Sequence, residues 1–168
     1  MNALNHDRLA ALTAQAISDL SAGYAGVMVS IGSRLGLYKA MAGAGPLTAS
    51  DVARRSGCAE RYVREWLNAQ AAGGYVAYHR ADATYELTPE QEQVFAADDS
   101  AVFVPHAWEV VASLWQDAPR AADAIRTGGG IAWGDHDERL YCGCASFFRN
   151  SYKANLISDW LPSLDGIV

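Results

Sequence analysis

The chain has 168 residues, of which 51% are hydrophobic, and 13 Lys and Arg against 19 Asp and Glu give a net charge of −6 at pH 7. Its length allows a sizeable core without disulfide or metal support, and its acidity argues against a protein that coats nucleic acid. No apolar stretch is long enough to span a membrane, and residues 1–8 lack a signal-peptide pattern, so we expect a cytoplasmic protein.

The first 41 residues have a helical pattern of apolar positions. It predicts an amphipathic helix from Asp7 to about Ser21 and a second helical segment from Tyr24 to Leu35, which Gly36 would end. Residues 37–41 are expected to add one short turn of helix before a break rich in glycine.

Residues 48–87 carry the clearest structural pattern. A short helix is marked by Thr48 as its N-cap and Gly57 at its end, and a second helix follows from Glu60. Two short apolar segments, 75–78 and 84–87, then flank a polar turn and predict a β-hairpin. This order of elements is that of a winged helix, so we predict a mainly α protein with a helix-turn-helix and a hairpin wing.

The rest of the chain is predicted to be helical and rich in aromatic residues. Thr88 and Pro89 are a good helix start. Residues 102–115 are apolar nearly all round, which predicts a helix that is buried, in part against a partner chain. Further helices are expected over 119–126 and after Asp135. A last helix, which contains three apolar residues spaced by four, is expected to end at Pro162. Those three are Tyr152, Leu156 and Trp160.

The sequence offers little that would carry chemistry. Glycines in 128–134 do not have the spacing of a dinucleotide-binding loop, and we interpret them as a helix end and connector. His136 lies within an acidic stretch that is typical of a first helical turn. Cys142 and Cys144 are too close for a zinc knuckle, and an odd total of three cysteines argues against a disulfide framework. We therefore predict no catalytic, cofactor-binding or metal-binding residue in this chain.

A winged helix also raises the possibility of DNA binding. Arg61, Arg64 and Asn68 would face outward from the second helix of the helix-turn-helix, where base-reading groups lie in such proteins. Between Thr48 and Arg80, however, five Arg stand against three acidic residues, which is weak for a reader that makes roughly 6–10 phosphate contacts. A MarR/ArsR-like transcription regulator with a small-molecule effector pocket is therefore the alternative hypothesis.

Several segments together point to a known family. Residues 32–41 are GSRLGLYKAM, residues 47–53 are LTASDVA and residues 60–67 are ERYVREWL. With Gly128–Gly130 and the closing WLPSLDGIV of residues 160–168, they resemble the N-terminal region of bacterial class I S-adenosylmethionine-dependent methyltransferases that carry a winged-helix dimerisation domain.

The resemblance implies a division of labour. Residues 1–97 would form the N-terminal helices and winged helix, and residues 98–168 a helical dimerisation and lid segment that leads toward a methyl-donor domain. Because residues 1–168 hold no such domain, we expect a catalytically incomplete part of a methyltransferase: a fragment, or the product of a short gene. S-adenosylmethionine would be the cofactor of the parent protein, and a homodimer is expected.

In the family this region also supplies part of the substrate pocket. Aromatic walls suit a flat organic substrate, so the parent protein is expected to act on a small aromatic or apolar molecule. The alternative for each of these aromatic residues is a place in the core. The residues that we predict to contact substrate are Tyr24, Met28, His106, Trp133, Tyr141, Phe147, Phe148 and Tyr152.

Overall fold

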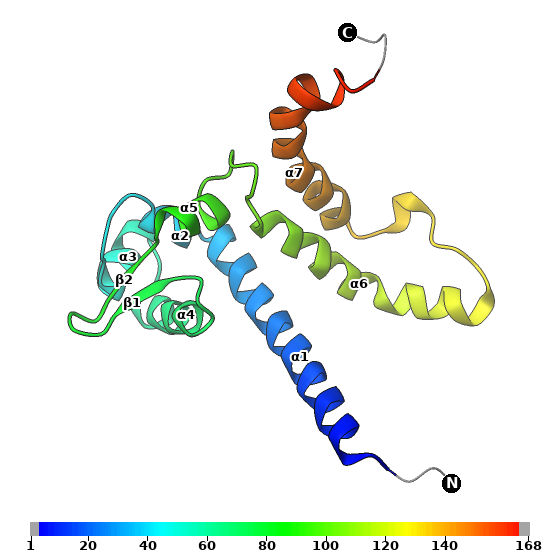
Figure 1. Ribbon diagram of the computed structural model, residues 1–168, viewed down its shortest axis with the longest axis horizontal. Helices are drawn as coiled ribbons and strands as arrows, with labels where there is room; N and C mark the ends of the chain where they lie inside the picture. Colours follow the sequence, from blue (N-terminus) through cyan, green and yellow to red (C-terminus); the bar gives the residue numbers. More distant parts are fainter. Residues whose placement is uncertain (1–3, 165–168) are drawn as a thin grey trace.

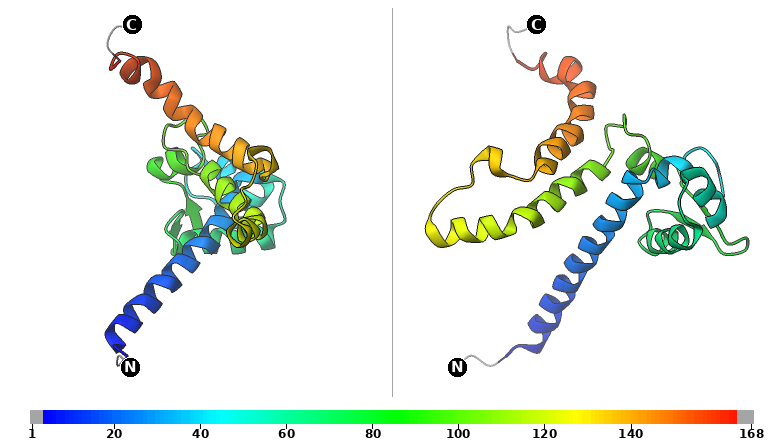
Figure 2. Two further views of the ribbon diagram at one scale, coloured as in Figure 1. Left: turned by 90° about the vertical axis from the view of Figure 1, so that its right-hand side faces the viewer. Right: turned by 180° about the vertical axis from the view of Figure 1, so that it is seen from behind.

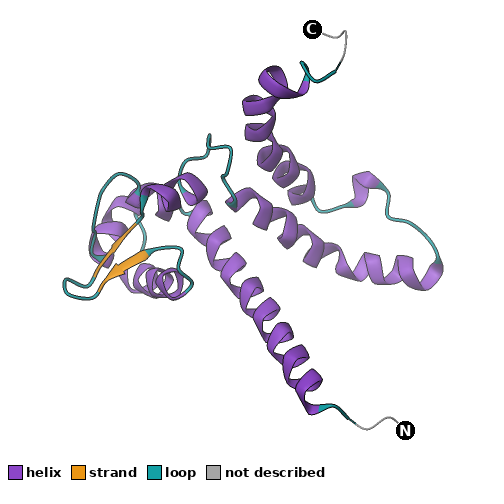
Figure 3. Ribbon diagram, in the orientation of Figure 1, coloured by secondary structure: helices purple, strands orange, loops and turns teal. Residues whose placement is uncertain are grey.

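The computed structural model describes residues 4–164, so the Asp165–Val168 part of the family resemblance lies outside the described residues. Helices dominate, with one two-stranded sheet among these residues (Figure 3). The elements are α1 (His6–Arg34), α2 (Leu37–Met41), α3 (Ala49–Ser56), α4 (Glu60–Ala72), β1 (Ala77–His79), β2 (Thr84–Glu86), α5 (Pro89–Phe95), α6 (Pro105–Thr127), the 3₁₀ turn η1 (Trp133–Asp135), α7 (Glu138–Asn155) and the π-helical turn η2 (Leu156–Trp160). None of the described helices is long and apolar enough to cross a membrane.

The predicted winged helix is confirmed. Thr48 caps α3 in a reciprocal capping box with Asp51, and Gly57 ends α3 with a left-handed φ of 68°, which favours glycine. After α4, strands β1 and β2 pair antiparallel with Tyr78 opposite Tyr85, and Leu47 bonds to Tyr85 from the other side. The local end signals therefore predicted the helix-turn-helix and its wing correctly.

One hydrophobic core lies within this winged helix and reaches the C-terminal third of α1. Gly32 of α1 lets the indole of Trp66 approach the helix backbone, and a Cβ at this position would lie 2.3 Å from Trp66 Cζ2. The Trp66 indole N–H donates to the Met28 carbonyl at 2.8 Å, which fixes the ring. Tyr38 packs edge-on against Trp66 and stacks on Phe95, so aromatic contacts join α1, α2, α4 and α5.

A buried hydrogen bond gives the core a testable polar contact. Tyr38 donates its hydroxyl to Gln70 Oε1 at 2.5 Å, and burial raises the pKa of Tyr38. Tyr38→Phe leaves Gln70 Oε1 without its donor, so we expect a loss of about 1–3 kcal/mol in the free energy of unfolding. Because the folded state holds the Tyr38 proton more tightly, stability falls as pH rises above about 10, and Tyr38→Phe reduces that fall. Denaturant titrations at pH 8 and 10.5 measure both effects, with exposed Tyr62→Phe as control.

Three predicted helix boundaries are wrong. The segments 7–21 and 24–35 form one helix, α1, since the single Gly23 between them weakens a helix without ending it. Residues 102–115 and 119–126 likewise belong to one helix, α6, with Pro119 inside it. Proline removes one hydrogen bond there, on an exposed side of the helix. The last predicted helix is the continuation of α7 through η2.

The overall shape is open. In Figures 1 and 2 the N-terminal half of α1 projects away from the winged helix, and α7 extends from α6 on the opposite side. The chain exposes 11232 Å² of surface, against roughly 8000 Å² for a compact monomer of its 18.0 kDa mass. The excess of roughly 3000 Å² is of the size that large protein interfaces bury.

Helix α6 differs from its prediction in which residues it buries. Val111, Leu114 and Trp115 are exposed, with 77% of Trp115 accessible, whereas Ser113 and Asp117 are buried. Within this chain the helix is thus not buried all round, and its predicted burial against a partner chain stays a prediction. Trp108 packs against α1 and Val110 against α7, whereas the exposed Val111, Leu114 and Trp115 are not covered by any described part of the chain. The polar residues contact α1 through Glu109 and the α6–α7 connection through Asp117.

Candidate functional site

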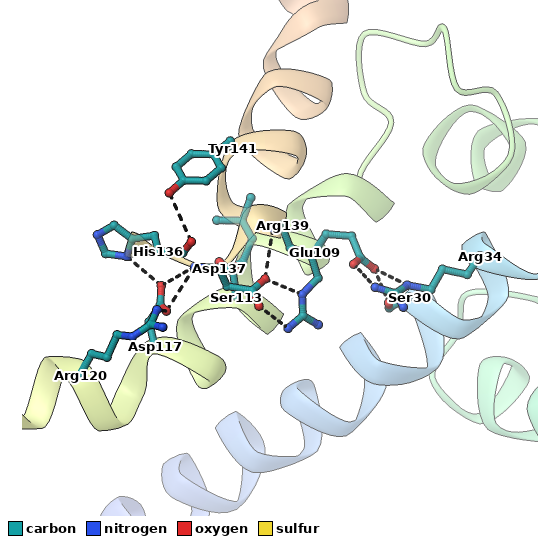
Figure 4. Close-up of polar contacts among 11 residues, drawn as sticks. Ser30, Arg34, Glu109, Ser113, Asp117, Arg120, His136, Asp137, Arg139 and Tyr141 are labelled. Atoms are coloured by element: carbon teal, nitrogen blue, oxygen red, sulfur yellow. Dashed lines mark hydrogen bonds and ion pairs between the residues drawn. The ribbon is translucent and has the colours of Figure 1, made fainter. Parts of the chain in front are cut away.

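A line of polar side chains runs along the buried side of α6. Glu109, Ser113 and Asp117 are four residues apart, which places them on one face of the helix. Figure 4 shows Glu109 directed toward α1 and Asp117 directed toward the connection that precedes α7. We call these three residues the α6 polar line. It joins three parts of the fold through charged groups.

At one end, Glu109 is held by α1. Arg34 donates to both Glu109 oxygens, Nη2 to Oε2 at 2.5 Å and Nε to Oε1 at 3.2 Å, and the Ser30 hydroxyl donates to Oε1. The bonds from Arg34 and Ser30 lower the pKa of Glu109 against the opposing effect of burial. Glu109 is therefore a carboxylate at neutral pH and is suited to a positioning role rather than to proton donation.

At the other end, the buried Asp117 carboxylate accepts several hydrogen bonds. His136 Nδ1 lies 2.7 Å from Asp117 Oδ2, the backbone N–H of Asp137 donates to both oxygens at 3.2 and 3.3 Å, and Arg120 Nη1 lies 3.2 Å from Oδ1. The bond from His136 is the main cause of a lowered pKa of Asp117, which burial opposes. We call Asp117, Arg120, His136 and Asp137 the Asp117 cluster.

The start of α7 is tied to this cluster. The Asp137 side chain caps α7 by accepting from the Arg139 backbone N–H at 3.1 Å, and Arg139 Nε donates to the same carboxylate at 2.7 Å. Tyr141, one turn into α7, donates its hydroxyl to the carbonyls of Trp133 and His136. The connection and the first turn of α7 thus form one hydrogen-bonded unit (Figure 4).

Two cavities lie beside the polar line. One, of about 350 Å³, contains His106 with Phe103 beside it, and the Lys39–Asp98 and Arg34–Glu109 ion pairs border it. Burial lowers the pKa of His106, so its imidazole is neutral at pH 7 and can exchange hydrogen bonds with a polar group. The second cavity, of about 380 Å³, lies between α1 and α6 and has Trp108 and Trp115 in its wall.

The structure places the predicted substrate residues in separate locations. His106 lines the cavity just described, Tyr24 is exposed on α1, and Met28 packs at the edge of the core. Five others belong to α7 and the connection before it. Ring contacts join Trp133 to Tyr141, Phe147 to Phe148 and Phe148 to Tyr152.

These five aromatic residues form a surface rather than a closed pocket. Tyr141, Phe148 and Tyr152 share one face of α7 by their spacing, and Tyr152 continues to Trp160 at a centroid distance of 5.5 Å. Tyr152 is about half exposed and Phe148 nearly so. We call the surface formed by Trp133, Tyr141, Phe147, Phe148 and Tyr152 the α7 aromatic face. It is an open surface in the described part of the chain.

The residues of the DNA-binding alternative are on α4, as predicted, but two of them have partners within the chain. The Tyr85 hydroxyl donates to Asn68 Oδ1 at 2.6 Å, and Arg64 forms an ion pair with Glu60 one turn away. Reading a base with Asn68 would require breaking the bond to the wing. Arg61 is exposed on the same helix.

The glycine run and the cysteines have the roles expected of structural residues. Gly128 ends α6 with a left-handed φ of 74°, and Gly129 and Gly130 continue into the connection. Cys142 is exposed and Cys144 is partly buried. Among the described residues, no three His, Cys, Asp or Glu side chains gather as metal ligands would.

Asp117 and Arg120 are the site residues that the sequence did not reveal. The acidic stretch around His136 was interpreted as a first helical turn, and Asp137 and Glu138 do occupy that place. The partner of His136 is instead a carboxylate 19 positions earlier. A polar residue every fourth position in the otherwise apolar α6 is the signal that indicates such a buried line.

Comparison with known families gives a match in the middle of the chain. Residues 23–96 match the model of the Rv2258c-like winged HTH domain. This winged HTH domain covers the last part of α1 and the elements from α2 through α5. The comparison with curated proteins returned no match.

Solved structures extend the likeness beyond the winged HTH domain. PigF, solved with SAH, superposes with a TM-score of 0.66 at 16% identity, over 90% of this chain and 48% of that one. Mitomycin 7-O-methyltransferase MmcR gives 0.65 at 17% identity, over 89% and 47%. Human N-acetylserotonin methyltransferase in complex with SAM gives 0.59 at 15% identity, over 98% and 51%. The chain spans about half the length of these proteins, and at these identities the likeness is one of fold.

Proposed function

We propose that this chain is the N-terminal dimerisation and substrate-recognition part of a class I S-adenosylmethionine-dependent methyltransferase. One observation carries the proposal: nearly the whole chain, helices beyond the winged HTH domain included, superposes on about half of mitomycin 7-O-methyltransferase MmcR and of human N-acetylserotonin methyltransferase. Residues 1–168 contain no Gly-x-Gly-x-Gly run. In this proposal, the methyl donor binds to a separate part of the parent protein.

Dimerisation is supported by the surface of α1. Apolar side chains recur every three to five residues on the side away from the buried Gly26, Val29 and Gly32, and they are 40–69% exposed. We call them the α1 stripe. It consists of Leu9, Leu12, Ile17, Leu20, Tyr24, Val27 and Ile31. A stripe of this length on a helix of about 44 Å is typical of a face that pairs with another helix.

Substrate recognition is supported by two features. The cavity at His106 offers a neutral imidazole next to the ring of Phe103, which suits a polar group on an aromatic or apolar molecule. The α7 aromatic face offers exposed rings for stacking with a flat molecule. In this proposal, the methyl-donor domain covers the α7 aromatic face and turns it into a pocket wall.

Two measurements test the proposal. The coding sequence after codon 168 is expected to continue in frame into a strand followed by an acidic-Gly-x-Gly-x-Gly loop. Calorimetry with residues 1–168 is expected to detect no S-adenosylmethionine binding, because the donor site is elsewhere. Micromolar affinity of this chain for S-adenosylmethionine would overturn the proposal that the donor site lies in another part of the protein.

The transcription-regulator alternative makes a different prediction. A duplex reader shows salt-dependent binding to DNA that Arg61→Ala reduces. We expect no such binding at 150 mM salt, because Arg64 and Asn68 are engaged within the chain. Electrophoretic mobility shifts with mixed-sequence duplexes measure it, and an Arg61-dependent shift would favour the regulator.

A further inference from the structure

The connection between α6 and α7, residues 128–137, is attached to α6 in an unusual way. Apart from the bond of the Gly129 backbone N–H to Thr127 Oγ1 at the very end of α6, its side-chain hydrogen bonds to α6 within the described chain involve Asp117 or Arg120. Trp133, its largest side chain, packs on His136 and Tyr141 and is 66% exposed. Polar bonds at one point, rather than apolar burial, therefore hold the connection in place.

Cavities lie on both sides of that point. A space of about 320 Å³ separates Ile131 and Asp135 from the last turns of α6, and another of about 520 Å³ lies between residues 134–137 and Gln116 to Arg120. A segment that packed tightly on α6 would leave no room for either. The connection thus bridges α6 and touches it mainly at the Asp117 cluster.

The two ends of the connection allow it to move. At one end, Gly128, Gly129 and Gly130 are exposed and have a wide choice of backbone conformations. At the other end, the backbone N–H of Asp137 is bonded to Asp117, and the Asp137 side chain caps α7. Loss of the Asp117 bonds would free both the connection and the start of α7.

We propose that residues 128–137 form a strap that opens and closes over α6, with the Asp117 carboxylate as its latch. In the closed state Asp117 accepts from His136 and from the Asp137 backbone, and Arg120 bonds both Asp117 and the Asp135 carbonyl. In the open state these bonds are exchanged for water. Trp133 then moves with the strap, away from α6.

The charges around the latch favour the closed state. Asp117 is faced by His136 and Asp137 from the strap, by Arg120 from its own helix, and by Arg139, on α7, beside Asp137. The His136 bond and the Arg120 charge keep Asp117 ionised, so the latch stays closed at neutral pH until the strap is displaced. The strap also carries one end of the α7 aromatic face. Its use as a gate for substrate rests on the proposed function, whereas its opening does not.

Hydrogen exchange tests the strap directly on the whole chain, without substrate or cofactor. Asp117→Asn removes the charge with little change in size, and we expect the amides of residues 131–140 to exchange at least about tenfold faster. Amides of α3 and α4 should exchange at the same rate as in the chain without the substitution. Asp123→Asn, an exposed carboxylate paired with Arg126 on the same helix, is the matched control and should change neither region.

A second variant distinguishes the loss of the Asp117 bonds from a loss of stability across the whole chain. His136→Phe keeps a ring beside Trp133 and Tyr141 but removes the donor to Asp117, and should also speed exchange in residues 131–140. Unchanged exchange in both variants would overturn the proposal, and so would an equal increase across α3 and α4. Failure here leaves the dimerisation and S-adenosylmethionine tests unaffected, so the two proposals can fail separately.

Discussion

Sedimentation of the chain is expected to give a homodimer, and Leu20→Asp is expected to give a monomer. Leu20 lies in the middle of the α1 stripe and is 60% exposed, so the substitution leaves the core of the winged HTH domain intact. In a helix pair it would bury a carboxylate without a partner, which costs several kcal/mol and weakens the dimer by about 100-fold or more. Sedimentation velocity from 1 to 100 μM, about the range of ordinary dimer constants, measures the change.

Ser18→Asp is the matched control for this experiment. Ser18 lies two residues from Leu20, on the opposite side of α1, and is also exposed. It should leave the dimer unchanged while adding the same charge to the same helix. A parent chain that stays monomeric throughout, or an equal loss of dimer in both variants, would remove the α1 stripe as the interface.

Gly32→Ala is expected to destabilise the chain strongly for its small size. The added Cβ would lie 2.3 Å from Trp66 Cζ2 and 2.9 Å from Tyr38 Cε2, and both rings are buried. Trp66 cannot withdraw without breaking its bond to the Met28 carbonyl. Overpacking of this kind costs about 1–3 kcal/mol and outweighs the gain of roughly 1 kcal/mol from replacing a helical glycine. Urea unfolding followed by tryptophan fluorescence measures the difference.

Gly23→Ala separates packing from helix propensity. Gly23 lies on the same helix, and its Cβ would meet nothing within 4 Å. This variant should gain up to about 1 kcal/mol from helix propensity alone. Measuring both variants in the Leu20→Asp background keeps dimerisation out of the comparison. Equal stability of Gly32→Ala and the parent would mean that Trp66 does not sit against Gly32 in solution.

Local chemistry explains what could be predicted of the fold. Thr48, Gly57 and Thr88 are capping residues whose side chains or conformations determine where a helix begins or ends. The positions of α3, α4, the wing and α5 follow from such local signals. They are also the elements whose apolar residues meet in one core, so local and tertiary preferences agree.

The wrong boundaries arise where local signals are weak against helix continuity. Gly23 and Pro119 each cost a helix some stability, but neighbouring turns on both sides hold α1 and α6 together. The exposed fraction of each residue on α6 also could not be predicted from the sequence. The periodicity of residues 102–115 predicted a helix that is buried in part against a partner chain, but it did not indicate which of its residues pack within the chain itself.

The candidate site shows the same limit. His106, Trp133, Tyr141 and the other aromatic residues could be chosen by residue type, whereas the pairing of Asp117 with His136 depends on how α6 and the connection meet in space. Tyr141, Phe148 and Tyr152 share one face of α7 because they lie on one continuous helix. Tyr24 and His106 were predicted for the same role but lie on different helices with separate surroundings.

The exposure of apolar residues on α6 has a consequence for how the newly made chain folds in a cell. In the proposed function, the exposed Trp115 side of α6 acquires its final environment only after a second chain or the methyl-donor domain packs against it. Until then the newly made chain exposes an apolar surface to which other chains can bind, so aggregation competes with folding. Synthesis at low temperature and at a slow rate should therefore raise the soluble yield of residues 1–168 more than it raises that of the winged HTH domain alone.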